Sequence, residues 1–159
     1  MVDEQTFVAE ARAMERTLYR VARGYLRSPD ECADAVQEAL CKAWDKRQTV
    51  APERFRPWLT RIVINECRNI GRRKRRVVPM ADVEPPPPSD APAPDLLDEL
   101  SALPEKLRTP LLLHYLEGFS LDEVAATLRA PTGTVKSRLH QARKALRLQL
   151  EKEDGQWND

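Results

Sequence analysis

The chain has 159 residues, of which 42% are hydrophobic and 32% charged, enough for one domain or two small ones with a solvated surface. Its net charge of +1 hides an uneven distribution of acidic and basic residues along the chain. That distribution indicates better than the net charge what the protein binds. We expect neither a signal peptide nor a membrane helix. The N-terminus is acidic, and no stretch approaches the roughly 20 apolar residues that a membrane span needs.

Four helices are predicted in the first part of the chain. The first covers about Glu4 to Tyr25. The second covers about Pro29 to Asp45, because Ser28 is a capping residue followed by a proline and acids that suit a helix start. A short piece near Pro52–Arg54 precedes a long helix from Phe55 or Pro57 to about Arg75.

Apolar residues recur at helical spacing in these segments and give the expected core. The first stripe consists of Phe7, Ala11, Met14, Leu18, Val21 and Ala22. The second consists of Ala33, Val36, Leu40, Ala43 and Trp44. The long helix contributes Leu59, Ile62, Val63 and Ile70.

A proline-rich segment from Val77 to Asp95 interrupts the helical pattern. Pro85–Pro88 cannot continue a helix, and the segment is acidic, so it indicates a semi-stiff linker. We therefore predict an all-α fold with two small helical domains, residues 1–76 and 96–159, joined by residues 77–95.

In the second part of the chain we predict a helical turn at Leu96–Leu100, followed by a helix from Pro104 to about Leu116. Ser120 and Glu123 have the spacing of a capping box, which starts a short helix that ends near Leu128. After a tight turn of about four residues, Thr132 is expected to cap a last helix over residues 133–150.

Two helices around such a turn are typical of a helix-turn-helix that binds DNA. We expect Val135, Leu139, Ala142 and Leu146 to pack on Leu121, Val124, Ala125 and Leu128. No acidic residue lies between Glu123 and Glu151, and the outward face is cationic and polar. The candidate DNA-binding residues are Thr134, Lys136, Ser137, Arg138, His140, Gln141, Arg143 and Lys144.

The long helix of the first part carries a second basic face, which continues into the tract Arg72–Arg76. Its candidate DNA-binding residues are Arg61, Asn65, Arg68 and Arg72. A basic tract alone is often a solvated helix end. The helix over Pro29–Asp45 instead has an acidic outer face, with Asp34 and Glu38 among its residues, that suits a basic protein partner.

These motifs resemble the group IV, or extracytoplasmic-function (ECF), sigma factors of bacterial RNA polymerase. The first part contains Asp34-Ala-Val-Gln-Glu38, Ala43-Trp44, Trp58-Leu-Thr-Arg-Ile-Val-Ile-Asn65 and a basic tract. The second contains Leu103-Pro104, Glu117-Gly-Phe-Ser120, Glu123-Val-Ala125 and Gly133-Thr-Val-Lys-Ser-Arg-Leu-His-Gln-Ala-Arg143. The chain departs from the family pattern at Asn69 and Gln141, so the resemblance does not specify which promoter bases are bound.

The resemblance implies that the protein binds core RNA polymerase and directs promoter recognition, DNA opening and transcription initiation. The first domain would contact the clamp of the largest polymerase subunit and recognise the −10 element. The second would contact the flap of the second-largest subunit and recognise the −35 element. Residues implied in polymerase binding are Asp34, Gln37, Glu38, Leu40, Cys41 and Trp44. The family also implies an anti-sigma factor and a cytoplasmic location.

Other interpretations explain less of the sequence. A helix-turn-helix regulator that is not a sigma factor accounts for residues 96–159 only, and an RNA-binding protein would need aromatic platforms. Cys32, Cys41 and Cys67 contain no CxxC pair, and the histidines lie far from them. We therefore predict buried reduced thiols, no metal or cofactor, and no enzymatic activity.

Overall fold

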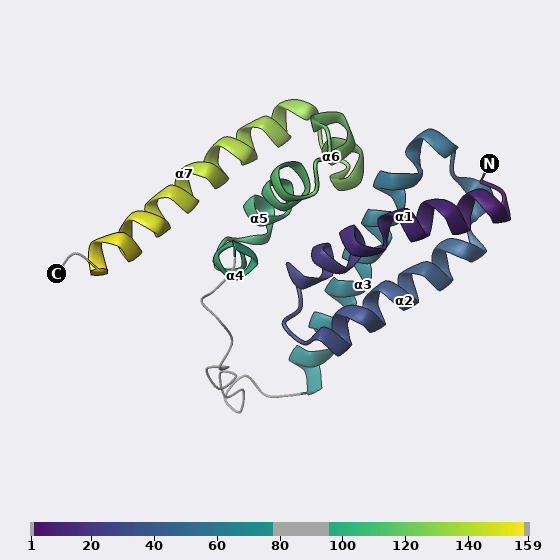
Figure 1. The fold of residues 1–159 in the computed structure, drawn as a ribbon, viewed down its shortest axis with the longest axis horizontal. Helices are drawn as coiled ribbons and strands as arrows, with labels where there is room; N and C mark the ends of the chain where they lie inside the picture. Colours follow the sequence, from purple (N-terminus) through teal and green to yellow (C-terminus); the bar gives the residue numbers. More distant parts are fainter. Residues whose placement is uncertain (1, 78–95, 158–159) are drawn as a thin grey trace. The chain divides into compact units, whose positions relative to one another are not determined.

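The computed structural model describes residues 2–77 and 96–157, and the predicted all-α fold is confirmed, with no strand among these residues. The chain divides between Pro94 and Asp95 into two compact units (Figure 1). The predicted proline-rich linker falls on residues 78–95, outside the described residues, apart from Val77, which ends a helix. None of the helices in the described ranges is long and apolar enough to cross a membrane.

Unit 1 is a bundle of three helices in which each helix packs against the other two (Figure 1). The helices are α1 (Glu4–Arg23), α2 (Pro29–Asp45) and α3 (Phe55–Val77). Two short 3-10 turns, η1 (Arg47–Thr49) and η2 (Pro52–Arg54), connect α2 to α3. The elements therefore follow the predicted order, with ends that differ by a few residues.

Side-chain caps fix where the first two helices begin. The backbone N–H of Thr6 donates to the Asp3 carboxylate at 2.7 Å, and that of Glu31 donates to the Ser28 hydroxyl at 3.3 Å. The bond from Thr6 lowers the pKa of Asp3. The start predicted at Ser28 is confirmed.

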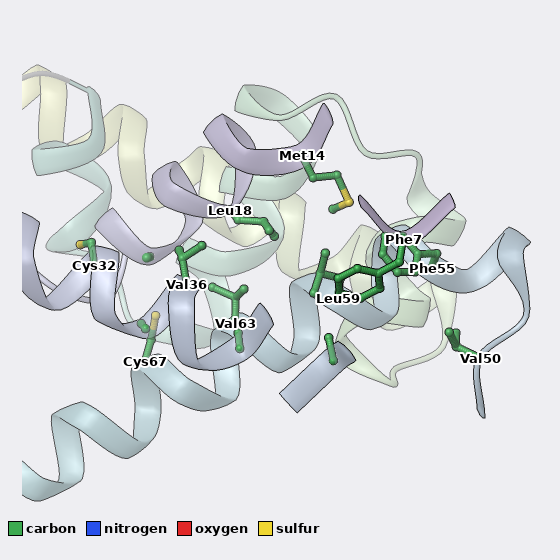
Figure 2. Packing of buried hydrophobic residues seen from close by; sticks show 14 of the residues in the cluster. Phe7, Met14, Leu18, Cys32, Val36, Val50, Phe55, Leu59, Val63 and Cys67 are labelled. Carbon is green, nitrogen blue, oxygen red and sulfur yellow. The ribbon is translucent and has the colours of Figure 1, made fainter. Parts of the chain in front are cut away.

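The core of unit 1 is built from aromatic, aliphatic and cysteine side chains (Figure 2). The Phe7 ring packs edge-on against Trp44 and Phe55, with centroids 5.3 and 5.5 Å apart. The predicted buried face of α2 is correct for Val36 and Ala43, with Leu40 and Trp44 packed partly buried against the core, but it is wrong at Ala33. Ala33 is exposed, whereas Cys32, Ala35 and Ala39 are buried with Val36 and Ala43. Three alanines and a cysteine thus make up most of the fully buried face of α2.

Unit 2 contains α4 (Leu96–Ser101), α5 (Glu105–Leu111), a π-helical turn η4 (Leu112–Leu116), α6 (Leu121–Leu128) and α7 (Thr132–Trp157). The single α-helix predicted from Pro104 to Leu116 is therefore wrong in its second half. Pro110 lies inside α5 and has no N–H to donate to the preceding turn, and the wider π-helical turn follows it. Gly118, with φ of +72°, then reverses the chain.

The helix-turn-helix forms as the sequence predicts. Ser120 and Glu123 make both bonds of the capping box, each 3.0 Å long. Arg129 takes a left-handed conformation with φ of +52° and ends α6. The expected role of Thr132 as a cap is corrected, because Thr132 is the first residue of α7, which also extends to Trp157 rather than Leu150.

Candidate nucleic-acid interface

All eight residues predicted to bind DNA in unit 2 lie within four turns of α7. In the sequence they alternate with the residues that α7 buries. Val135, Leu139 and Ala142 are buried, and Leu146 is half-buried. Thr134 and Arg138 are half-buried. The other six side chains are exposed: Lys136, Ser137, His140, Gln141, Arg143 and Lys144. The helix thus presents a continuous polar and cationic surface while its apolar side is covered.

The apolar side of α7 packs against α5 as well as α6, whereas the sequence indicated α6 alone. This packing brings the beginning of α5 beside the first turns of α7. Lys106 and Pro104 line a shallow groove there. The groove is completed by Leu107, Gly133, Thr134, Ser137, Arg138 and Gln141. Lys106 is therefore a cation at the candidate interface that periodicity within single helices did not identify.

A second shallow groove lies farther along α7 and is lined entirely by cationic or titratable side chains. These are His140, Arg143, Lys144 and Arg147. Their spacing of three and four residues places them on one stripe of the helix. Tyr115 of η4 reaches this stripe: its hydroxyl accepts a hydrogen bond of 2.6 Å from Arg143. The stripe concentrates positive charge where a phosphate backbone can approach.

The candidate residues of α3 form a second exposed surface in unit 1. Asn65, Arg68 and Arg72 are exposed, and Arg61 is half-buried. Arg68 donates to the Asn65 side-chain oxygen at 3.4 Å. Farther along the basic tract, Lys74 forms an ion pair with Glu31 of α2 at 2.5 Å. Lys74 of the tract therefore joins α3 to α2, whereas Arg72 and Arg73 are exposed on the same helix.

The segment before α3 is fixed at both ends and exposed between them. Val50 and Phe55 are buried in the core of unit 1. The four residues between them, Ala51 to Arg54, are all exposed and include the turn η2. The segment, called the anchored projection below, is thus a short exposed stretch directly before α3, held by a buried residue on each side.

The outward face of α2 is acidic. Asp34, Gln37, Glu38 and Cys41 are exposed, and Leu40 and Trp44 are half-buried. Asp30 and Asp45 extend the exposed acidic surface toward the two ends of the helix. Negative charge is unfavourable for DNA binding and favourable for binding a basic protein surface.

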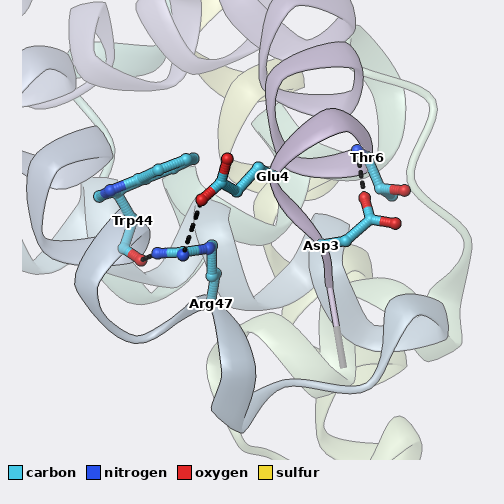
Figure 3. A network of polar contacts seen from close by, with 5 residues as sticks. All are labelled: Asp3, Glu4, Thr6, Trp44 and Arg47. Atoms are coloured by element: carbon cyan, nitrogen blue, oxygen red, sulfur yellow. Dashed lines mark hydrogen bonds and ion pairs between the residues drawn. The ribbon is translucent and has the colours of Figure 1, made fainter.

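Trp44, at the end of this face, is held by a polar network (Figure 3). The Arg47 guanidinium lies 4.0 Å from the centroid of the Trp44 ring and donates to the Trp44 carbonyl at 2.8 Å. Arg47 also pairs with Glu4 at 3.5 Å. The network ties the start of α1 to the end of α2 and fixes the indole at the surface.

Two cysteines are buried and one is exposed, so the prediction of buried thiols is wrong for Cys41. Burial raises the pKa of Cys32, whose thiol contacts the Leu26 carbonyl at 3.4 Å. Burial also raises the pKa of Cys67 to about 12. Within the described ranges, no three His, Cys, Asp or Glu side chains are grouped so that they could hold a metal ion.

Comparison with known proteins relates each unit to a known family. Residues 11–77 match the family described as Sigma-70 region 2, and residues 94–146 match the family described as Sigma-70, region 4. The RNA polymerase sigma factor SigV of Bacillus subtilis (strain 168) is 31% identical over 146 residues, which cover 88% of this chain and 88% of that protein.

Two further matches agree with this relationship. The ECF RNA polymerase sigma-E factor of Escherichia coli (strain K12) is 31% identical over 134 residues, which cover 71% of this chain and 70% of that protein. The sigma factor RpoE from Bartonella quintana, solved in a co-crystal with the anti-sigma factor NepR, is 27% identical with a TM-score of 0.74. That match covers 91% of this chain and 96% of the RpoE chain.

Proposed function

The chain belongs to the ECF group of RNA polymerase sigma factors, and from this membership we propose which of its surfaces bind promoter DNA and which bind the polymerase. The observation that carries the proposal is the separation of charge: α3 and α7 each present a basic face, and α2 presents an acidic one. Sigma factors are DNA-binding transcription initiation factors, so each face has a partner of opposite charge in that process.

Unit 2 is proposed to bind the −35 element with the outward face of α7. Ser137, His140 and Gln141 are exposed hydrogen-bonding side chains that suit base edges in the major groove. Lys136, Arg138, Arg143 and Lys144 add charge for phosphates on either side, and Lys106 of α5 lies at the edge of the same surface. The polymerase flap is the proposed protein partner of this unit.

Unit 1 is proposed to bind and open the −10 element with α3 and the projection Ala51 to Arg54. Asn65 and Arg68 are exposed and linked to each other, which suits one base edge and one phosphate. Unstacking a base costs a few kcal/mol per step, and capture of the extruded base by the anchored projection would offset that cost.

The acidic face of α2 is proposed to bind core RNA polymerase at the clamp of the largest subunit. Asp34 and Glu38 supply charge, and Leu40 and Trp44 supply half-buried apolar surface beside it. Such a combination of a hydrophobic anchor and charged surroundings is typical of protein interfaces. Because core polymerase works in the cytoplasm, a cytoplasmic location is part of the proposal.

Control by an anti-sigma factor is also proposed. The RpoE chain that this fold resembles was solved with the anti-sigma factor NepR. An inhibitor that covers the face of α2 or α7 would compete with polymerase or DNA for the same exposed side chains.

A helix-turn-helix regulator that is not a sigma factor is the weaker candidate. Such a protein would share the fold of α6 and α7, but it would not account for the match of residues 11–77 to Sigma-70 region 2.

Transcription in vitro tests the proposed function directly. Purified full-length protein is mixed with bacterial core RNA polymerase and a library of templates with randomised upstream sequence. We expect transcripts from templates enriched for two short elements at −35 and −10, and none without the protein. Absence of a complex with core polymerase, or transcription without enrichment of any element, would contradict the proposal.

A further inference from the structure

Tyr115 is an exposed aromatic residue in an unusual place. It lies in the π-helical turn η4, and half of its side chain, 50%, is exposed. Turns of this kind are rare and occur frequently at functional sites. The neighbouring residues fix its position: the His114 ring packs edge-on against it with centroids 4.9 Å apart, and His114 Nδ1 lies 2.8 Å from the Phe119 carbonyl oxygen.

Tyr115 restrains Arg143 through two contacts. Arg143 donates a hydrogen bond of 2.6 Å to the Tyr115 hydroxyl, and its guanidinium carbon lies 5.6 Å from the centroid of the phenol ring. The two residues are 28 positions apart in sequence, so the contact depends on the packing of unit 2. An exposed arginine would otherwise have many rotamers, and a ligand would bear the entropic cost of ordering it.

The partner of Arg143 is a neutral phenol, so the positive charge of the arginine is not compensated. A guanidinium has five N–H donors, and the bond to Tyr115 occupies one of them. Arg143 also lines the groove that it shares with His140, Lys144 and Arg147. An ion pair with a carboxylate would restrain the arginine equally well but would weaken its attraction for an anion.

We propose that Tyr115 is a positioning residue that preorganises Arg143 of α7 to bind a phosphate of the DNA backbone beside the −35 element. The inference rests on the proposed DNA-binding role of α7 and extends it to a residue outside the helix-turn-helix. The hydroxyl of Tyr115 acts through Arg143 and need not touch DNA. The expected loss on its removal therefore depends on whether Arg143 is present.

The test uses full-length protein assembled with core polymerase and a promoter fragment that the wild-type holoenzyme selects from the randomised library. Affinity is measured over a series of salt concentrations for Tyr115→Phe, Arg143→Ala and the double variant. Tyr115→Phe should weaken promoter binding by about three- to tenfold, the effect of one ordinary hydrogen bond. The slope of log K against log salt should fall in magnitude by up to about 0.9, the value for one phosphate contact.

The double variant decides between positioning and direct contact. If Tyr115 acts through Arg143, Tyr115→Phe/Arg143→Ala should bind no more weakly than Arg143→Ala. Unchanged affinity in Tyr115→Phe, or equal losses in the presence and absence of Arg143, would overturn the inference. Tyr19→Phe is the matched control in unit 1, and the melting temperature and core affinity of all variants should match those of the wild type.

Failure of the inference is distinguishable from failure of the proposed function. A wild-type holoenzyme that selects no −35 element would contradict the DNA-binding role of α7 and the inference with it. A wild type that selects such an element, combined with additive losses in the double variant, would contradict the role of Tyr115 alone.

Discussion

The surroundings of Cys67 disfavour its thiolate, so we expect this cysteine to be unreactive in the folded protein. Burial raises its pKa to about 12, and Cys32 is buried beside it and shifted in the same direction. Cys41, by contrast, is exposed on the proposed polymerase-binding face. Since the thiolate is the reactive form, the three cysteines should differ sharply in reactivity.

Alkylation at about pH 8, near the reference thiol pKa, should therefore modify one cysteine in the native protein and three after denaturation. Intact-mass measurement over time gives the count, and Cys41→Ser should abolish the fast phase. Rapid modification of Cys67 in the folded chain would contradict its burial. Because the pKa of Cys67 in the folded protein lies above the ordinary thiol value of 9.0, the unfolded chain deprotonates first. Its contribution to stability is thus lost as pH rises from about 9 to about 12.

Glu66 is a buried carboxylate whose partner comes from another helix. Lys42 of α2 donates to Glu66 Oε1 at 2.5 Å, while the Glu66 side chain is 4% exposed and that of Lys42 is 46% exposed. Lys42→Ala should leave the carboxylate unpaired and lower the free energy of unfolding by about 1–3 kcal/mol.

Urea unfolding followed by tryptophan fluorescence measures this loss. Lys46→Ala is the matched control, because Lys46 is an exposed lysine just after α2, and it should change stability by less than about 0.5 kcal/mol. Equal stability of Lys42→Ala and the wild type would show that water replaces the lysine at Glu66.

At the scale of the elements, the capping box of α6 should contribute measurably to the stability of unit 2, because α6 is a short helix. α6 spans Leu121–Leu128, and an eight-residue helix is unstable without packing and caps. Ser120→Ala removes the hydroxyl that accepts from the Glu123 N–H and should destabilise unit 2 by about 1 kcal/mol.

Ser137→Ala is the matched control for Ser120→Ala, because it removes a serine hydroxyl that we assign to DNA binding and not to a helix cap. Ser137 is exposed on α7, so its variant should keep the melting temperature of the wild type and lose promoter affinity. Circular dichroism on heating and promoter binding well below the transition measure the two effects. A Ser120→Ala protein as stable as the wild type would contradict the proposed importance of the cap.

The sequence predicts well those elements that depend on local chemistry. The starts at Ser28 and Ser120 follow from capping groups within three residues of each other, and the outward face of α7 follows from its own periodicity. The choice among the alanines of α2 could not be predicted as well, because Ala33 and Ala39 are equally apolar and only packing selects Ala39 for the core.

Features that depend on contacts distant in sequence were missed. The π-helical turn after Pro110, the groove that adds Lys106 to α7, and the bond from Arg143 to Tyr115 all require the packing of α5 or η4 against α7. No periodicity within one helix contains that information. The proline inside an otherwise regular pattern was the one available signal for the change in helix type.

At the scale of the whole molecule, polymerase binding and promoter binding are assigned to different surfaces that should act independently within one chain. The acidic face of α2 should affect polymerase binding alone. Glu38→Lys reverses an exposed charge on that face and should weaken association with core polymerase by about tenfold or more if the contact is electrostatic. Fluorescence titration of core with labelled protein measures the affinity. Glu15→Lys, an exposed charge reversal on α1, is the control and should bind core as the wild type does.

Lys136→Glu separates promoter binding from polymerase binding, because Lys136 is exposed on α7 and belongs to the proposed −35 surface only. Core affinity and transcription from a library-selected promoter are measured on the same preparation of this variant. We predict core affinity equal to that of the wild type together with loss of −35-dependent initiation. Equal loss of core binding and initiation, or normal initiation from the selected promoter, would contradict the assignment of α7 to promoter DNA.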